Sequence, residues 1–208
     1  MVSGLNELMP YGDWRAKLEE AERVELGPDD RKAILVEAFS ECLAKLGHFD
    51  YVAETTILRP LRDRTLYCLF YATRHPTGIE VFRDCQVKAL EEQSRTRAAT
   101  KVKHAVKSTG QREIFQSLHD MGPDDVTAFL ESERVNAEKV LLALTPDEPA
   151  SIPYQKLWPQ VLARHVVRKP DVNKMASRLR DEHCLIFPGW EKGKRVPQPH
   201  YKTQRPAR

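Results

Sequence analysis

Seven polar and basic side chains near the C-terminus have the types and spacing best suited to contact an anionic polymer. Four lie within one short segment and three in the basic, Pro- and Gly-rich segment that follows it: Asn173, Lys174, Ser177 and Arg178, then Lys192, Lys194 and Arg195. Asn and Arg can hydrogen-bond to base edges, whereas Lys and Ser more often hold phosphates. Each neutralised phosphate releases counterions and adds salt-sensitive affinity. The pattern predicts contact with nucleic acid, and with duplex DNA in particular.

The distribution of charge favours an anionic partner for this region. Residues 151–208 contain 13 Lys or Arg and 4 Asp or Glu, a balance of +9. Residues 1–150 contain 20 basic and 26 acidic residues, a balance of −6, and the two regions together give the net charge of +3. A basic module on an acidic body is typical of nucleic-acid-binding proteins. A solvated basic face and a protein-binding surface are the alternatives that charge leaves open.

Two helices and a loop between strands are expected to position these side chains. Residues 154–167 place apolar residues on one helical face, with Pro159 in the early part of the helix. After a turn, Asp171 is expected to cap a second helix over 172–183. The segment CLIF (184–187) predicts a strand, residues 188–200 a loop that Trp190 pins to the module, and YKTQ (201–204) a return strand. This is the element order of a winged helix-turn-helix, whose second helix enters the major groove.

The preceding residues predict a mixed α/β region. Helices are expected over 13–23 and 28–47, and strands over 51–58 and 66–73 are expected to form a hairpin. The apolar run of the second strand is typical of a strand buried on both faces. Another helix is expected to begin after Pro76. The predicted domains are an α/β region over 1–93, a basic linker with a short helix over 94–122, and a helix plus the winged module over 123–205. The core module spans 151–205, after the Pro-rich break at 145–153.

The remaining reactive side chains do not form a recognisable catalytic pattern. The sequence contains no GxSxG, P-loop or HExxH motif, and its seven histidines are dispersed. Cys42, Cys68, Cys85 and Cys184 are scattered among apolar neighbours, which predicts reduced and mostly buried thiols rather than a metal site. No apolar run approaches the roughly 20 residues of a transmembrane helix. We therefore expect a cytoplasmic protein without a membrane partner, and no catalytic, cofactor-binding or metal-ligating residues.

Two segments carry a family resemblance. LYCLFYATRHPTGIEVFRDCQVKAL (66–90) and PYQKLWPQVLARHVVRKPDVNKMASRLRDEHCLIFPGWEKGKRVPQPHY (153–201) resemble the C-terminal half of the three-Cys-motif partner protein (TcmP) family. The resemblance spans about 14–201 and is sharpest at ATRHPTG and at PGW…KRVPQP. It implies a partial Rossmann-like, methyltransferase-like region with antiparallel strands, then a C-terminal winged helix-turn-helix. It also implies a partner of radical-SAM type that bears three cysteines.

The sequence departs from that family where the family's cofactor would bind. A methyltransferase-like fold places a glycine-rich loop after its first strand, but no two of the nine glycines here have G-x-G spacing. This predicts a fragment or a natural truncation without a SAM site, so we expect no bound cofactor. Three hypotheses remain: a DNA-binding accessory protein of the three-Cys system, a protein–protein interaction module, and a truncated methyltransferase-like protein without activity of its own.

Overall fold

The computed structural model of the chain describes residues 6–58, 65–109 and 124–207. It divides into two compact units. The first unit contains residues 1–57 and 67–79, and the second contains residues 58–66 and 80–208. The expected boundary at residue 93 is therefore replaced by one near residue 80, because the helix that follows the hairpin continues into the second unit.

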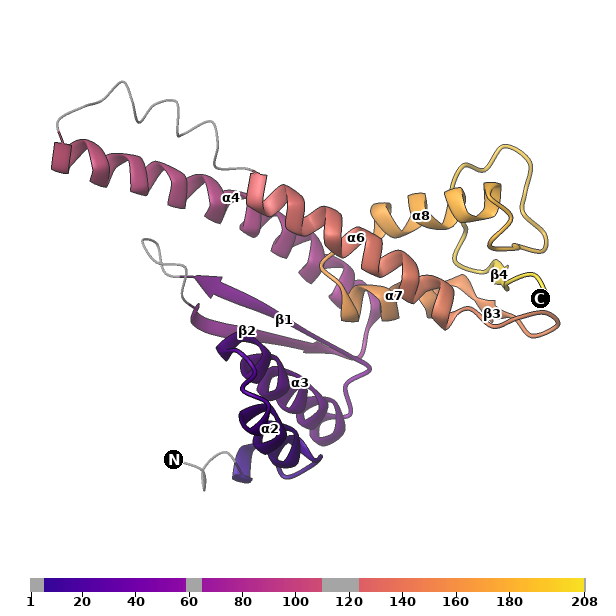
Figure 1. Cartoon of the computed structure of the whole chain (residues 1–208). Coiled ribbons are helices and arrows are strands. Elements are labelled where there is room, and N and C mark those ends of the chain that lie inside the picture. Colours follow the sequence, from indigo (N-terminus) through magenta and orange to yellow (C-terminus); the bar gives the residue numbers. More distant parts are fainter. Residues whose placement is uncertain (1–5, 59–64, 110–123, 208) are drawn as a thin grey trace. The chain divides into compact units, whose positions relative to one another are not determined.

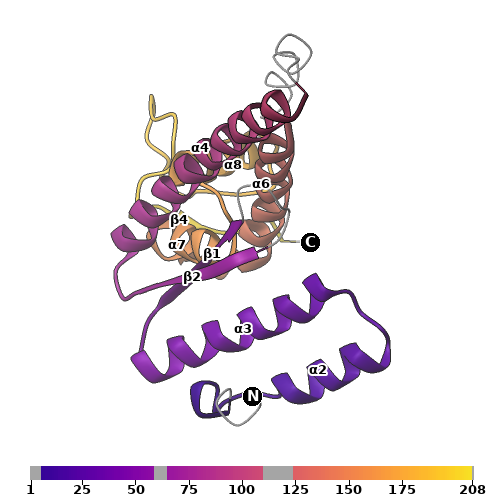
Figure 2. The same cartoon turned by 90° about the vertical axis from the view of Figure 1, so that its left-hand side faces the viewer.

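Two antiparallel helices form the base of the first unit (Figure 2). They are α2 (Trp14–Arg23) and α3 (Pro28–Gly47), as the sequence predicts. Trp14, Ala38 and Cys42 are buried between them together with Met9, and the Trp14 indole N–H donates to the Met9 carbonyl at 3.0 Å. The helix α3 ends at Gly47 and is followed by His48 in the left-handed conformation (φ 49°) as its C-cap. Glycine suits position 47 because a Cβ there would overlap the ring of Phe49.

A hairpin of two consecutive strands packs on α3. The strands β1 (Tyr51–Leu58) and β2 (Thr65–Thr73) form a two-stranded sheet and run in opposite directions (Figure 1). Phe70 of β2 meets Phe39 of α3 edge to face, with ring centroids 4.7 Å apart. The expectation that β2 is buried on both faces is wrong, because Tyr67 and Leu69 are 52% and 46% exposed. Helix α3 covers one face of a sheet that has only two strands in the described part of the chain.

The segment ATRHPTG makes the turn from β2 into the next helix. The Thr73 hydroxyl accepts a hydrogen bond from the His75 backbone N–H at 3.1 Å, and the guanidinium of Arg74 donates to the Gly47 and His48 carbonyls. Gly78 fits because a Cβ there would lie 2.6 Å from the Thr73 hydroxyl oxygen and 2.8 Å from that of Tyr71. A larger residue at position 78 would therefore have to displace these two hydroxyl groups.

Helix α4 (Pro76–Thr109) is far longer than the sequence analysis expects. Residues 94–109, predicted as a linker, are helical. The prediction failed because it relied on missing apolar periodicity, whereas Arg, Lys and Ala are strong helix formers and no Gly or Pro interrupts the run before Gly110. The short helix expected over 111–121 lies outside the described residues.

Four helices build the second unit around a shared core (Figure 1). They are α4 from Glu80 onward, α6 (Asp124–Leu144), α7 (Tyr154–Arg164) and α8 (Lys169–Asp181). Val87 of α4, Leu130 of α6 and Val166 after α7 form one buried cluster. The helix α7 stays continuous through Pro159, which is buried beside Trp158 within an apolar face. A completely buried stripe on α8 completes the core, namely Val172, Met175, Ala176 and Leu179.

A small antiparallel sheet closes the C-terminal end of this unit. Strand β3 (Ile152–Pro153) pairs with β4 (Lys202–Thr203). On the other side of β4, the Ile186 and Gln204 backbones exchange hydrogen bonds of 2.8 and 3.0 Å. The predicted strand over 184–187 is therefore reduced to a single bridge at Ile186. The predicted return strand is present as β4.

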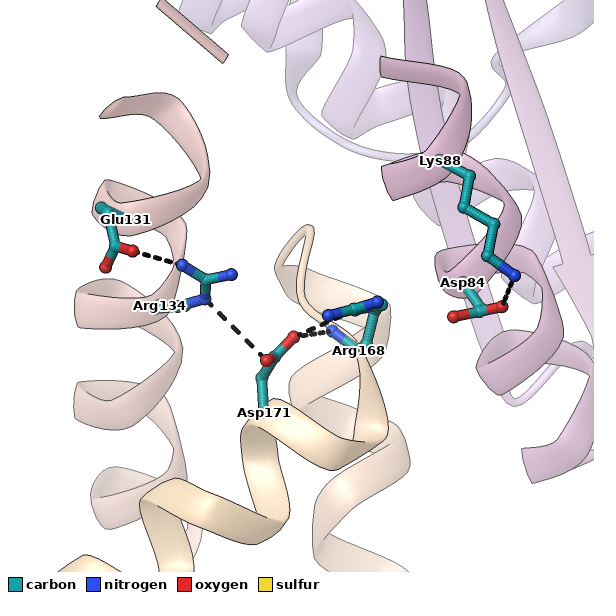
Figure 3. Close-up of polar contacts among 6 residues, drawn as sticks. All are labelled: Asp84, Lys88, Glu131, Arg134, Arg168 and Asp171. Carbon is teal, nitrogen blue, oxygen red and sulfur yellow. Dashed lines mark hydrogen bonds and ion pairs between the residues drawn. The ribbon is translucent and has the colours of Figure 1, made fainter. Parts of the chain in front are cut away.

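The start of α8 differs from the expected capping pattern. Arg168, and not Asp171, is the N-cap, and Asp171 lies in the first turn, where its carboxylate accepts the Arg168 backbone N–H at 3.1 Å. Pro170 fits in this first turn because its missing N–H is one that a helix leaves unpaired there. In Figure 3, Asp171 lies between Arg168 and Arg134 of α6, whose Nε is 4.0 Å from the carboxylate. The aspartate thus joins the start of α8 to α6.

The observed fold class is mixed α and β, with each sheet of the described residues containing two named strands. The two-stranded hairpin of β1 and β2 has the antiparallel arrangement that the family resemblance implies. The Rossmann-like character of this region stays a prediction. In the same part of the chain, no helix has both the length and the apolar composition needed to cross a bilayer. The expectation of mostly buried thiols holds for Cys42 alone: Cys68 is half-buried, while Cys85 and Cys184 are exposed.

Candidate nucleic-acid interface

The structure brings the two groups of sequence-predicted residues together through Ser177. Its hydroxyl oxygen lies 2.9 Å from the Asn173 carbonyl, one turn back on α8, and 2.9 Å from the Arg195 carbonyl in the loop. Both acceptors compete for one hydroxyl proton. Ser177 therefore links the helix to the loop, and its predicted contact with a phosphate stays a prediction.

An aromatic cluster holds the base of the loop over residues 188–200. The Trp190 ring lies 5.3 Å from that of Phe187 and 5.5 Å from that of Tyr201, and Phe187 and Tyr201 are buried. The Trp190 indole N–H donates to the Lys194 carbonyl at 3.0 Å. The Arg180 guanidinium of α8 lies 3.9 Å from the Trp190 centroid, a cation–π contact. Trp190 thus pins the loop to α8, as the sequence predicts.

Asn173 is oriented by a residue of the preceding helix. Its side-chain oxygen accepts a hydrogen bond of 2.8 Å from the hydroxyl of Tyr154, which is 1% exposed. Burial raises the pKa of the Tyr154 phenol far above its ordinary value, so the hydroxyl remains a donor. The backbone N–H groups of Tyr154 and Gln155 donate in turn to the Tyr201 and Pro199 carbonyls. The first turn of α7, the middle of α8 and the end of the loop therefore form one connected surface.

Two of the predicted basic contacts have acidic neighbours. Arg178 forms an ion pair with Glu138 of α6 and lies 3.8 Å from Glu182. Lys194 lies 4.0 Å from Glu191 within the loop. Glu138 is the stronger restraint, because its side chain is only 23% exposed and meets the guanidinium directly. Arg178 is therefore paired with α6 while its side chain stays 58% exposed, and its contact with DNA stays a prediction.

The other predicted cations are free to meet an anion. Lys174, Lys192 and Arg195 have exposed side chains, and within the described residues these side chains make no ion pair. Sequence reasoning missed two further exposed cations of the same kind, Lys156 in the first turn of α7 and Lys202 in β4. Both could have been found from the predicted elements, since each lies next to an apolar residue that must point inward. We call these five, together with Lys194, the basic surface.

A buried polar cluster fixes the end of α7 behind this surface. Arg83 of α4 is 1% exposed, and its guanidinium donates to the carbonyls of Leu162 and Ala163 at 2.6 and 3.0 Å and to the Gln86 side chain. A cation at this position also complements the negative end of the helix dipole. This role of Arg83 could not be predicted from the sequence, because Leu162, whose carbonyl accepts from the guanidinium, lies 79 residues away along the chain.

Glu133 of α6 completes the cluster. Its carboxylate accepts the Val166 backbone N–H at 2.7 Å and lies 3.4 Å from the His165 Nδ1. Burial alone would raise the pKa of Glu133, but the His165 contact, the Val166 N–H and the charge of Arg83 outweigh it and lower the pKa. The turn between α7 and α8 is thus held from α6 by a charged group.

The described residues contain no cluster of three or more His, Cys, Asp or Glu side chains that could hold a metal ion. Comparisons with protein-family models, with curated proteins and with solved structures found no match to this chain. The geometry of the second unit is therefore the basis for its proposed role.

Proposed function

We propose that the second unit is a winged helix-turn-helix that binds duplex DNA, with α8 in the major groove and the loop over 188–200 as the wing. The order α6, β3, α7, α8, Ile186, loop and β4 supports this fold, and so does the placement of β4 between β3 and Ile186. In such a module the second helix of the pair is the recognition helix. Lys174 and Asn173 lie on the corresponding face of α8.

The observation that carries the proposal is the link between α8 and the loop at Ser177. It joins Lys174 of the helix and Arg195 of the loop in one surface, so a duplex seated on α8 also meets the loop. An interface of this kind gains most of its affinity from phosphates, and sequence preference from the few side chains that reach base edges. Asn173 is the best placed to read a base, because Tyr154 fixes its amide.

The family resemblance gives this activity a setting. We propose that the chain is an accessory protein of a three-Cys-motif system whose partner is of radical-SAM type. The two segments in which the resemblance is sharpest also have defined places in the structure. ATRHPTG forms the turn in which Gly78 lies against the Thr73 and Tyr71 hydroxyls, and PGW places Trp190 in the aromatic cluster.

A fluorescence-anisotropy titration with a labelled duplex of about two helical turns tests DNA binding. We expect the wild-type chain to bind at low salt and the variant K192A/K194A/R195A to bind at least tenfold more weakly, because each lost phosphate contact costs nearly one decade at about 0.1 M salt. The control R15A/K17A/K45A removes the same three charges from exposed positions of the first unit and should bind like the wild type. Equal loss in both variants would mean that only net charge matters.

A second candidate function is docking of a protein partner on the same surface. Glu138 and Glu191 favour it, because their ion pairs with Arg178 and Lys194 make the surface mixed in charge. Winged helices also serve as protein-binding modules. Pull-down with the three-Cys partner separates the two functions: a wing variant that loses DNA but retains the partner supports DNA binding as the role of the basic surface.

A further inference from the structure

The second edge of β2 is a part of the hairpin that the proposed function does not use. Among the described residues β1 is the only strand that pairs with β2, so no further strand adds to the sheet at this edge. Natural sheets usually protect such edges with charged residues or proline, but the nine residues of β2, TLYCLFYAT, contain neither. We propose that this edge pairs with β2 of a second copy of the chain, forming a two-fold dimer.

The residue order of β2 favours a second copy over any other strand. Read outward from Leu69, two of the four flanking pairs are identical, Tyr67 with Tyr71 and Thr65 with Thr73. The other two pairs, Cys68 with Phe70 and Leu66 with Ala72, are apolar and carry no charge. Antiparallel pairing of two identical strands about Leu69 therefore places Leu opposite Leu, Tyr opposite Tyr and Thr opposite Thr. Aromatic and threonine pairs of this kind are among the favourable cross-strand pairs. A two-fold axis requires such self-complementarity.

The faces of the strand agree with this arrangement. Cys68 and Phe70 point to the covered face, where Phe70 meets Phe39 and the Cys68 sulfur lies 3.8 Å from the Thr56 hydroxyl. Tyr67 and Leu69 lie on the opposite face and are exposed. Pairing through β2 would join the two hairpins into one four-stranded sheet and would bring both copies of Tyr67 and Leu69 onto one continuous apolar face. A sheet of that size is far more stable than an isolated hairpin.

Charge also selects β2 over β1 as the self-pairing strand. Bringing two β2 edges together opposes no like charges, whereas β1 carries Glu54 near its middle.

The apolar area that the dimer would bury is modest: Tyr67 alone exposes about 100 Å² if half of a typical tyrosine surface is counted. An interface built on one strand pair is at the small end of specific interfaces. We therefore expect a dimer of micromolar rather than nanomolar affinity.

Sedimentation equilibrium over protein concentrations up to about 0.5 mM tests the proposal. We expect the wild-type chain to dimerise reversibly and L69K to dimerise at least tenfold more weakly, because the two lysines would face each other across the axis. The control L46K makes the same change at an equally exposed leucine of α3 (56%) and should leave dimerisation unchanged. A wild-type chain that stays monomeric throughout overturns the proposal and leaves the edge to a strand of a different protein. A dimer that L69K does not weaken overturns it as well.

Cross-linking provides a readout that does not depend on how well L69K folds. Residues directly opposite in an antiparallel pair have Cα atoms about 4.5–5.5 Å apart, within the range of a disulfide. In a background with Cys68→Ser, L69C should therefore form a disulfide between the two copies of residue 69 on mild oxidation, identified by peptide mapping. L46C should not form the equivalent link. Absence of the 69-to-69 link in a folded protein contradicts pairing about this position.

Discussion

Replacing Arg83 with methionine should destabilise the second unit more than a substitution at any exposed position of that unit. Methionine retains the unbranched stem of arginine but removes the guanidinium, which is 1% exposed and donates to Leu162, Ala163 and Gln86. Each hydrogen bond to a charged group contributes about 1.5–3 kcal/mol, and buried acceptors that lose their donor pay a desolvation cost. Relaxation and water entry reduce the sum, so we expect a loss of about 3–5 kcal/mol, as for other broken buried ionic networks.

Native-state hydrogen exchange read by mass spectrometry is the suitable assay. The chain divides into two compact units, and in a protein with more than one such unit a single optical transition does not define one free energy of unfolding. Peptides from α7 and α8 report on the second unit alone. A loss of 3–5 kcal/mol corresponds to an acceleration of about 100- to 4,000-fold in the slowest-exchanging amides of that unit. Peptides from α2 and α3 should exchange at the wild-type rate.

The matched control is R95M on the same helix. Arg95 is 71% exposed and lies 3.8 Å from Glu92, so its loss should change stability by no more than about 0.5 kcal/mol. If R83M and R95M exchange at similar rates, the buried guanidinium does not stabilise the end of α7 and the reasoning is refuted.

Three further predictions concern the surroundings of the basic surface. E133Q should be less stable than the wild type at neutral pH. The pKa of Glu133 is lower in the folded protein than its ordinary value of 4.5, so the ionised carboxylate stabilises the folded state above that pH and the stabilisation is lost as the pH falls. The unfolding free energies of E133Q and the wild type should therefore converge in acid. S177A should accelerate exchange in the loop around Arg195 and weaken DNA binding several-fold, while α8 stays protected and S177T restores both. E138Q should release Arg178 and raise DNA affinity by up to about eightfold at 0.1 M salt. Unchanged affinity in an anisotropy titration would exclude Arg178 from the interface.

The sequence predicted elements well where the pattern is local. The bounds of α3 and β1 follow from Pro28, Gly47 and a β-rich run, and the structure matches them. The local pattern did not predict the C-terminal half of α4. That half has no apolar stripe, and its residues form a helix to Thr109 through their helix propensity. Local patterns also failed at Asp171, because a proline in the first turn of a helix looks like a proline before the helix.

The candidate site was predictable only as a set of residues on the right elements. The roles depend on contacts between distant positions: Glu138 restrains Arg178, Arg195 binds Ser177 through its carbonyl, and Arg83 reaches the end of α7. A basic residue looks the same in sequence whether it pairs with an acid or stays free. Lys174, Lys192 and Arg195 are exposed, and among the described residues their side chains form no ion pair.

The salt dependence of duplex-DNA binding tests the central proposal most directly. The basic surface has six exposed cations, and at about 0.9 per phosphate contact they predict a slope near −5 for log K against log salt concentration. The variant K192A/K194A/R195A should reduce the slope to between about −2 and −3, while R15A/K17A/K45A should leave it near −5. Salt-dependent binding that changes in this pattern is the result expected. No binding at low salt, or a slope that the wing variant leaves unchanged, would contradict DNA binding through this surface.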